Sequence, residues 1–438
     1  MNSTLKSMLI AAAAITSVSA FAQDKATLDL LVKKGLITAE ERAKTLDEAA
    51  KARTASGLNK VFVKEDATKR LTFSGRIQTQ FESISGETTN NSGTVAQSVD
   101  ISSAFMRRLY LGFKADMGEG ISGEIVYNFA EKNSDNKSLD KAIFTAETAL
   151  GSIVLGHQKV QWGLEENTSS SKLLTVERSA SNRFWNEGAG SGSGRLGFGA
   201  RHTGLHYSNK YAVDAAQTLE YGFAAVNALQ DEKTANTNND LGFYANLIYT
   251  YKVTDTNKHS LGINWGSARD TRDAAGAPGS GTESATISGF NPYIKSQFDK
   301  LVVQAEYIGT TNEARGAAVE RKPEGFTLLA AYKFTDQVEG IVRYSQLDTD
   351  GQGASFADLY RDAKNVGGFY NKFDSVYVGV NYYFVEHNAK IMLGYEKAKA
   401  SQRLGDASLA TGTSTLNGVV GTGKADADIF RLQAQVLF

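Results

Sequence analysis

Residues 71–82 alternate apolar and polar side chains. Phe73 and Ile77 belong to one face of this segment, and Arg76 and Gln78 belong to the other. A period of two is that of a β-strand with one apolar and one polar face. With this segment, about sixteen segments alternate in this way, each near the 9 to 11 residues that a tilted strand needs to cross a bilayer. The others are residues 103–116, 121–131, 139–149, 152–159, 195–207, 218–229, 241–253, 260–268, 285–298, 301–310, 325–334, 338–347, 373–384, 389–397 and 427–438.

The connections between these segments alternate between short and long. Residues 117–120 and 299–300 are short turns, whereas residues 83–102, 269–284 and 398–426 are long and polar. Outer-membrane barrels have short periplasmic turns and longer extracellular loops. If the first strand runs outward, every long connection falls on the outer side. A soluble β-sandwich also alternates, but it needs neither strands of this length nor this pattern of connections.

The sequence therefore predicts an all-β fold, a transmembrane antiparallel β-barrel of about 16 strands that occupies residues 71–438. The last segment supports this prediction, because Phe430, Leu432 and Phe438 share one face of a strand that ends the chain on an aromatic residue. Such an ending is typical of the signal that outer-membrane barrels present to the barrel-assembly machinery. Pairing of the last strand with the first removes the free sheet edges that lipid would leave unsatisfied.

The N-terminal part has a different pattern. Residues 1–22 have Lys6, an apolar run and the small-residue cleavage pattern of a secretory signal peptide. Residues 23–70 read as a periplasmic helical segment followed by a linker, with a capping box that begins at Thr38. This segment is either a small amphipathic hairpin or a short trimeric coiled coil. After the signal peptide no apolar run is long enough for a membrane-spanning helix.

Composition narrows the function classes. The chain has no cysteine and a formal net charge of -1, so that thiolate chemistry is excluded and no attraction to nucleic acid is expected. His202 and His206 lie four residues apart on a predicted strand, roughly 13 Å, which is too far for a shared metal ion. The sequence predicts neither a cofactor nor an enzyme.

Residues 156–195 break the alternation and contain both Trp162 and Trp185. A long segment of this kind inside a compact fold is typically functional. Sixteen strands leave an aqueous channel, so that we predict an inward-folded loop that narrows it. Trp162, Phe184 and Trp185 are expected to anchor this loop to the wall.

The lumen-facing charges have a modest positive bias. If the apolar face is outward, nine basic residues face inward against six acidic ones. The basic residues are Arg76, Arg108, Lys114, Arg195, Arg201, Lys295, Lys333, Arg343 and Arg431, and the acidic residues are Glu82, Asp116, Glu124, Glu306, Glu339 and Glu396. Rings of Arg and Lys suit anion pores; alternatively, these charges pair among themselves without a net preference.

Two further points concern single charges. The predicted loop has as many basic as acidic residues, because Lys159, Lys172, Arg178 and Arg183 stand against Glu165, Glu166, Glu177 and Glu187. Arg107 would face lipid in this register, where a charge costs about 2 to 4 kcal/mol. Either Arg107 lies near the outer interface, where it meets lipid phosphates or another subunit, or the local register is different.

The candidate pore-lining and anion-binding residues are Arg76, Arg108, Lys114, Lys159, Arg178, Arg183, Arg195, Arg201, Lys333 and Arg343.

The loop sequence resembles a known family. The run of residues 156–166, GHQKVQWGLEE, followed by Ser169-Ser170 and by Glu177-Arg178-Ser179, is similar to the phosphate-selective porin O and P family. Gln161 stands where that family usually has proline. The resemblance implies a trimeric sixteen-stranded barrel whose third loop enters the lumen and whose arginines and lysines attract phosphate or other anions.

The predicted function is therefore an outer-membrane porin for the passive diffusion of small anions, with the phosphate preference that the resemblance implies; the alternative is a general or sugar-permeable porin. An adhesin or structural barrel with a sealed lumen is a third hypothesis. The predicted partners are two further copies of the chain, outer-membrane lipid and lipopolysaccharide, and small anions such as phosphate. The predicted location is the outer membrane of a Gram-negative cell, with the N-terminal segment in the periplasm.

Overall fold

The computed structural model describes residues 32–34, 38–40, 70–130, 139–186, 194–227, 240–270, 285–313, 320–361, 366–404 and 421–438. The predicted signal peptide and most of the predicted helical segment lie outside these residues. The chain divides into two units, Met1–Thr72 and Phe73–Phe438. Among the described residues no helix has the length and apolar character needed to cross a membrane.

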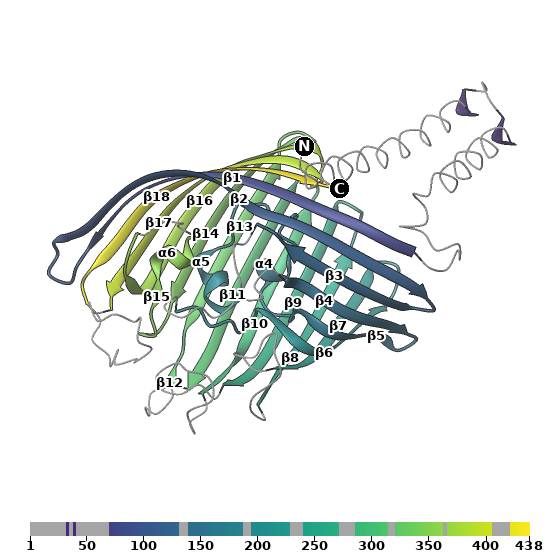
Figure 1. The fold of residues 1–438 in the computed structure, drawn as a ribbon, viewed down its shortest axis with the longest axis horizontal. Coiled ribbons are helices and arrows are strands. Elements are labelled where there is room, and N and C mark those ends of the chain that lie inside the picture. Colours follow the sequence, from purple (N-terminus) through teal and green to yellow (C-terminus); the bar gives the residue numbers. More distant parts are fainter. Residues whose placement is uncertain are drawn as a thin grey trace, which may run out of the picture. The chain divides into compact units, whose positions relative to one another are not determined.

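The second unit is a closed antiparallel barrel (Figure 1). Its wall consists of sixteen strands, because two of the eighteen strands in the sheet have only two residues. Each strand pairs with its neighbours along the chain, and the last strand pairs with the first in an antiparallel register from Arg76↔Leu437 to Thr88↔Ala425. The prediction of a sixteen-stranded barrel that is closed by the C-terminal strand is confirmed.

The strands that make the wall are β1 (Arg70–Thr89), β2 (Val95–Gly118), β3 (Ile121–Asn128), β4 (Leu139–Thr148), β5 (Gly151–Lys159), β6 (Arg201–Ala212), β7 (Gln217–Asn227), β8 (Leu241–Lys252), β9 (Asn257–Asp270), β10 (Ala285–Phe298), β11 (Leu301–Glu313), β13 (Glu324–Lys333), β14 (Val338–Asp348), β16 (Phe369–Val385), β17 (Ala389–Arg403) and β18 (Lys424–Leu437). The two short strands are β12 (Glu320–Arg321) and β15 (Ala354–Ser355), and the described helices are α4 (Leu164–Asn167), α5 (Ala180–Asn186) and α6 (Phe356–Leu359).

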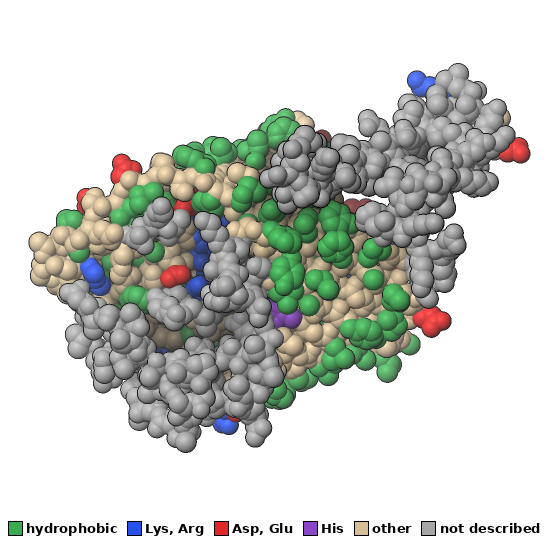
Figure 2. Space-filling view, viewed as in Figure 1, with side chains coloured by type: hydrophobic (Ala, Val, Ile, Leu, Met, Phe, Trp, Pro, Cys, Tyr) green, Lys and Arg blue, Asp and Glu red, His purple; other side chains and the backbone are tan. Residues whose placement is uncertain are grey.

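The alternation in sequence becomes an alternation of faces. On β14 the exposed Val342 and Tyr344 alternate with the buried Ile341, Arg343 and Ser345. A strand places successive side chains on opposite faces, so that the apolar residues form the outer surface and the polar ones turn into the lumen. Hydrophobic side chains accordingly cover much of the outside of the wall (Figure 2).

Several strands are longer than predicted. β1 has 20 residues and β2 has 24, so that a hairpin replaces most of the long connection expected over residues 83–102. The strands continue there with small and polar residues. A search for alternating apolar residues does not detect such strands. The loop that follows β5 is also longer than predicted, because the wall resumes only at Arg201 in β6.

Candidate functional site

The described residues between β5 and β6, 160–186 and 194–200, lie inside the barrel and are here called the lumen loop. Its aromatic side chains are fully buried: Trp162, Trp185 and Phe198 are each 0% exposed. Trp162 packs edge-on against Phe198 with ring centroids 4.7 Å apart, and the Trp185 indole donates a hydrogen bond of 3.0 Å to the Thr310 hydroxyl of β11. Trp185 thus joins the loop to the wall, whereas Trp162 packs against another residue of the loop. Much of the loop contacts the strands from β10 to β18, which follow it in the chain.

Gly163 allows the first turn of the loop. Its φ is +83°, and a Cβ at this position would lie 2.4 Å from the Asn186 side-chain nitrogen. Its N–H donates to the Asn291 Oδ1 of β10 at 3.0 Å. The backbone at Gly163 therefore binds the wall in a conformation that residues with a side chain rarely adopt.

Replacing Gly163 with alanine is expected to lower the unfolding free energy by about 1–3 kcal/mol. Alanine would strain the backbone at this positive φ, and its methyl group would clash with the Asn186 side chain. The change is measurable by denaturant titration with tryptophan fluorescence, since both loop tryptophans are buried. Gly93 is the matched control: its φ is +81°, but an added Cβ meets nothing within 4 Å. Equal losses for Gly163→Ala and Gly93→Ala would exclude the proposed steric cause.

Arg343 of β14 connects the loop to the wall. Its guanidinium pairs with Glu165 of the loop at 3.0 Å and with Glu396 of β17 at 2.9 Å, and its side chain is 0% exposed. It also donates to the Glu177 carbonyl at 2.8 Å. The other Glu165 oxygen accepts from the Ser179 N–H at 2.8 Å and from its hydroxyl at 2.6 Å. Arg343 is therefore a structural cation of the loop and has no contact with open water.

Glu177 organises a second ion network. The Arg107 guanidinium of β2 binds both of its carboxylate oxygens, at 2.5 and 3.0 Å, and Arg361 approaches at 3.3 Å. Burial alone would raise the pKa of Glu177, but the two arginines outweigh this effect and hold the pKa well below its usual range. Arg107 faces inward, so that the second of the two alternatives holds and the local register differs from a strict period of two. Arg107 and Arg108 are both buried, which shows that the alternation of faces breaks between them.

A third network lies at the end of β5. Glu166 pairs with Lys159 at 2.6 Å and with Arg178 at 3.0 Å. Burial would raise the pKa of Glu166, but Arg178 and Lys159 lower it below its ordinary value. Arg178 also donates to the carbonyls of Glu165 and Thr168, at 3.0 Å each. Arg178 therefore closes the loop upon itself, while Lys159 is partly exposed.

Partly exposed polar side chains stand beside this network on the inward face of β1 to β6. Arg201 pairs with Asp140 at 2.6 Å. Arg76 donates to the Ser170 hydroxyl at 2.5 Å and lies 4.8 Å from the centre of the Tyr110 ring. Together with the buried Arg178 and Glu166 of the network, the basic residues here outnumber the acidic ones by four to two: they are Arg76, Lys159, Arg178 and Arg201, against Asp140 and Glu166. Figure 2 shows basic side chains, with an acidic one beside them, in a hollow near the middle of the view.

Lysines gather at the end of the barrel where the turns are short. Lys295 of β10 and Lys333 of β13 are exposed on the inward face, and Lys172 of the loop is exposed near them. Among the described residues none of these three has a carboxylate in ion-pair contact. Lys390 of β17 is buried and donates to the Leu173 carbonyl at 2.8 Å. Together Lys172, Lys295, Lys333 and Lys390 are here called the lysine cluster.

His387 lies in the turn between β16 and β17, where partial burial and the positive charges of the lysine cluster shift its pKa. Its Nδ1 lies 3.4 Å from the Lys390 Nζ. Partial burial and then the four lysines lower the pKa of His387 to about 4. The histidine is therefore neutral at neutral pH, and the positive charge of this region comes from the lysines.

This pKa predicts a pH dependence. The unfolded chain binds a proton at His387 below a pKa of about 6.5, whereas the folded chain binds it only below about 4. Stability should therefore fall as the pH decreases from about 6.5 to 4. We expect His387→Gln to reduce this fall by about 1 kcal/mol, after discounting for partial exposure. Unfolding titrations at pH 7 and pH 5 measure it; the same fall in both proteins would contradict the assignment.

The remaining predicted site residues take separate places. Arg108 is buried and donates to the Gln78 side chain at 2.7 Å, and Arg183 donates to the Leu359 carbonyl at 2.9 Å. Arg195 pairs with Asp358 of α6 at 3.5 Å, and Lys114 is exposed on β2. The structure brings Arg76, Lys159, Arg178 and Arg201 together, and it places Lys333 in the lysine cluster.

Sequence reasoning missed Asp140 and Lys390 as lumen residues and did not group the lysines. The signal was present for Lys390, because the exposed Ile391 and Leu393 follow it on the outward face and the period of two turns Lys390 inward. No such signal exists for Asp140, because it has the parity of the exposed Phe144 and the register between β3 and β4 shifts at this residue. The grouping of Lys172 with Lys295 depends on the path of the lumen loop, which no local pattern contains.

The comparison with protein families is decisive. The family model described as phosphate-selective porin O and P matches residues 72–436, which is most of the chain. The chain belongs to the phosphate-selective porin O and P family. It is thus an outer-membrane porin of a Gram-negative envelope, as the loop sequence indicated, and its family and fold are those of channels. No curated protein sequence matches this porin at a significant level.

Solved structures support the fold of this porin. The outer-membrane channel DcaP of Acinetobacter baumannii is 14% identical with a TM-score of 0.52, covering 86% of this chain and 99% of DcaP. An anion-selective porin from Comamonas acidovorans is 12% identical with a TM-score of 0.52, covering 84% and 99%. A trimer form of OmpT, an outer-membrane protein of Vibrio cholerae, is 14% identical with a TM-score of 0.51, covering 85% and 100%. At these identities the likeness concerns the fold alone.

Proposed function

We propose that this porin is a passive channel that selects small anions, with phosphate as the preferred solute. The observation that carries the proposal is the lysine cluster, in which three exposed ammonium groups lack ion-pair partners among the described residues. Unpaired cations on a low-dielectric wall attract anions and repel cations. Most arginines of the lumen loop are held by carboxylates and carbonyls, so that the lysines supply the net field.

Phosphate preference is proposed on two grounds. One is the family description. The other is the arrangement of Arg76, Lys159 and Arg201, whose partly exposed side chains stand close to one another beside the lumen loop. A guanidinium offers a planar fork of donors that matches phosphate oxygens, and an ammonium adds a point charge. A divalent oxyanion gains more from several such groups than chloride does.

The remaining proposals concern assembly. We propose that this porin has no catalytic role and no cofactor, and that three copies form the functional unit, as in the trimer form of the Vibrio cholerae protein. The C-terminal strand would be the segment that the barrel-assembly machinery receives. Outer-membrane lipid and lipopolysaccharide would surround the apolar outer surface. Residues 1–22 would be the signal peptide and residues 23–70 a periplasmic segment.

The test is the reversal potential of the purified porin in a planar bilayer under a potassium chloride gradient, repeated with phosphate added. Anion selectivity, together with a chloride current that phosphate blocks at low concentration, is the expected result. Cation selectivity would overturn the anion channel. Anion selectivity without block by phosphate would leave a general porin, and no current at all would indicate a sealed structural barrel.

A further inference from the structure

Three tyrosines on the outward face make the same contact. The hydroxyl of Tyr307 donates to Glu324 at 3.1 Å, that of Tyr344 donates to Asp374 at 3.4 Å, and that of Tyr395 donates to Asp428. In each case the carboxylate lies on the neighbouring strand, two residues from the register partner of the tyrosine, toward the end with the long connections. The partners are Tyr307↔Phe326, Tyr344↔Val376 and Tyr395↔Phe430.

This row of tyrosines separates two kinds of surface on β17 and β18. On one side of Tyr395 the outward residues are apolar, including Leu393 and Leu432, which are each 40% exposed. On the other side they are charged or polar, beginning with Lys397 and Asp428. Tyrosines of membrane proteins gather where hydrocarbon meets the head groups. The row therefore marks the outer membrane–water boundary.

The surface beyond the row carries charges of both signs, and only some of them form ion pairs. Lys397 pairs with both Asp426 and Asp428. Lys399 has Asp374 of β16 and Asp426 of β18 as its register partners, and Lys424 is the register partner of Ser401. Both Lys399 and Lys424 are exposed, and neither has a carboxylate in ion-pair contact in the part of the chain that the structure describes. Two exposed ammonium groups thus stand on the outward face at head-group level, available to a phosphate that approaches from outside.

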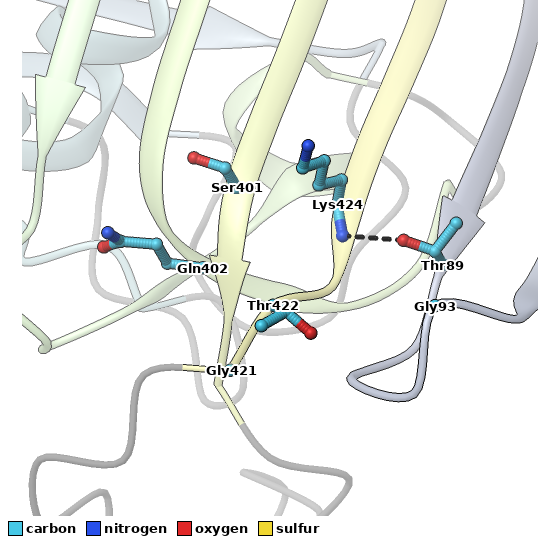
Figure 3. Close-up of a pocket in the computed structure, with 7 residues that line it drawn as sticks. All are labelled: Thr89, Gly93, Ser401, Gln402, Gly421, Thr422 and Lys424. Carbon is cyan, nitrogen blue, oxygen red and sulfur yellow. Dashed lines mark hydrogen bonds between the residues drawn. The ribbon is translucent and has the colours of Figure 1, made fainter.

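A hollow lies beside these lysines at the outer ends of β1, β17 and β18. It has a volume of about 710 Å³, and Thr89, Ser401, Thr422 and Lys424 contribute to its lining. Figure 3 shows the Lys424 side chain extended above the hollow, while its backbone N–H donates to the Thr89 hydroxyl at 3.0 Å. Hydroxyl groups and an ammonium around an open hollow suit a phosphorylated sugar, which carries both hydroxyls and a strong anion.

We propose that this surface binds the phosphorylated sugar head group of an outer-leaflet glycolipid, with Lys399 and Lys424 contacting its phosphate groups. The position of these two lysines is the reason for choosing this ligand. The lysines follow directly on the tyrosine row, where the phosphates of lipid head groups are concentrated and where basic side chains gain from them. The proposal rests on the outer-membrane location and is independent of solute selectivity in the lumen.

The experiment measures binding of bisphosphorylated lipid A, in detergent, to the refolded full-length porin. Lys399→Gln/Lys424→Gln should bind at least ten-fold more weakly, whereas Lys399→Arg/Lys424→Arg should stay within about three-fold of the parent, since arginine keeps the charge. The matched control is Lys300→Gln/Lys322→Gln, which removes the same charge from two exposed connections between strands, away from the lumen and from this surface. Unchanged single-channel conductance shows that each variant is folded.

The other outcomes decide the proposal as well. Dephosphorylated lipid A should bind at least ten-fold more weakly to the parent protein, and millimolar inorganic phosphate should not displace the lipid. Equal lipid binding by the parent and the Lys399→Gln/Lys424→Gln variant would overturn the proposal. So would displacement by inorganic phosphate, or a double variant that alters only the oligomeric state in light scattering.

Discussion

Replacing Arg343 with alanine is expected to lower the unfolding free energy by about 3–5 kcal/mol, the typical result of removing one partner from a buried ion network. The change leaves Glu165 and Glu396 without their shared cation, in a region where Arg343 is 0% exposed. It also removes the donor to the Glu177 carbonyl of the lumen loop. We therefore expect the loop to detach and the single-channel conductance to rise together with its noise.

The measurements are denaturant unfolding, followed by tryptophan fluorescence, and single-channel recording. Arg269→Ala is the control, because this arginine is 56% exposed and lies 3.9 Å from Asp240; such surface pairs contribute less than about 1 kcal/mol. The variant Arg343→Met/Glu165→Gln/Glu396→Gln removes the uncompensated charges and should recover much of the stability. If Arg343→Ala were no worse than the control, the buried network would not hold the loop.

Removal of the exposed lysines should abolish anion selectivity. In Lys172→Gln/Lys295→Gln/Lys333→Gln the formal charge of the lysine cluster decreases by three, which leaves Lys390, itself close to the carboxylate of Glu339. We expect the anion-to-cation permeability ratio to fall by about ten-fold or more and the effect to weaken at high salt, because screening shortens the reach of these charges. The reversal potential under a salt gradient measures this ratio.

The control removes three lysines that lie outside the lumen, in Lys322→Gln/Lys372→Gln/Lys399→Gln. Its ratio should stay close to that of the parent, although its net charge changes equally. A similar loss of selectivity in both variants would mean that the overall charge of the protein determines selectivity. Unchanged selectivity in the lumen variant would mean that the group around Arg76 and Arg201 determines anion selectivity.

The barrel could be predicted because its signal is local and repeated. Alternation such as Val342-Arg343-Tyr344 places side chains on two faces whatever the partner strand is, and lipid on one face requires apolar residues over its whole height. The ends of the strands were harder to predict. The outer parts of β1 and β2 pair with one another beyond the apolar band, where small polar residues such as Ser83 and Ser102 have no bilayer to match.

Arg107 shows where a local pattern fails. A strict period of two assigns it to lipid, but Arg107 and Arg108 both turn inward, and Glu177, which lies 70 residues away in the chain, binds the Arg107 guanidinium. A charge on the lipid face near the bilayer midplane would cost about 2–4 kcal/mol. A local break in the alternation avoids this cost, and such irregularities are common features of strands. No signal within β2 contains the position of Glu177.

By itself, the sequence determined the barrel and its sixteen strands, and it marked residues 156–195 as the segment that breaks the alternation, because periodicity acts over a few residues. Only the tertiary structure decided which charges remain open to a solute. Arg178 and Arg343 look like Lys172 and Lys333 in a list of inward cations, yet carboxylates and carbonyls hold the arginines, while the lysines stay exposed. The reason is physical: whether a charge is neutralised depends on contacts between segments that lie far apart along the chain.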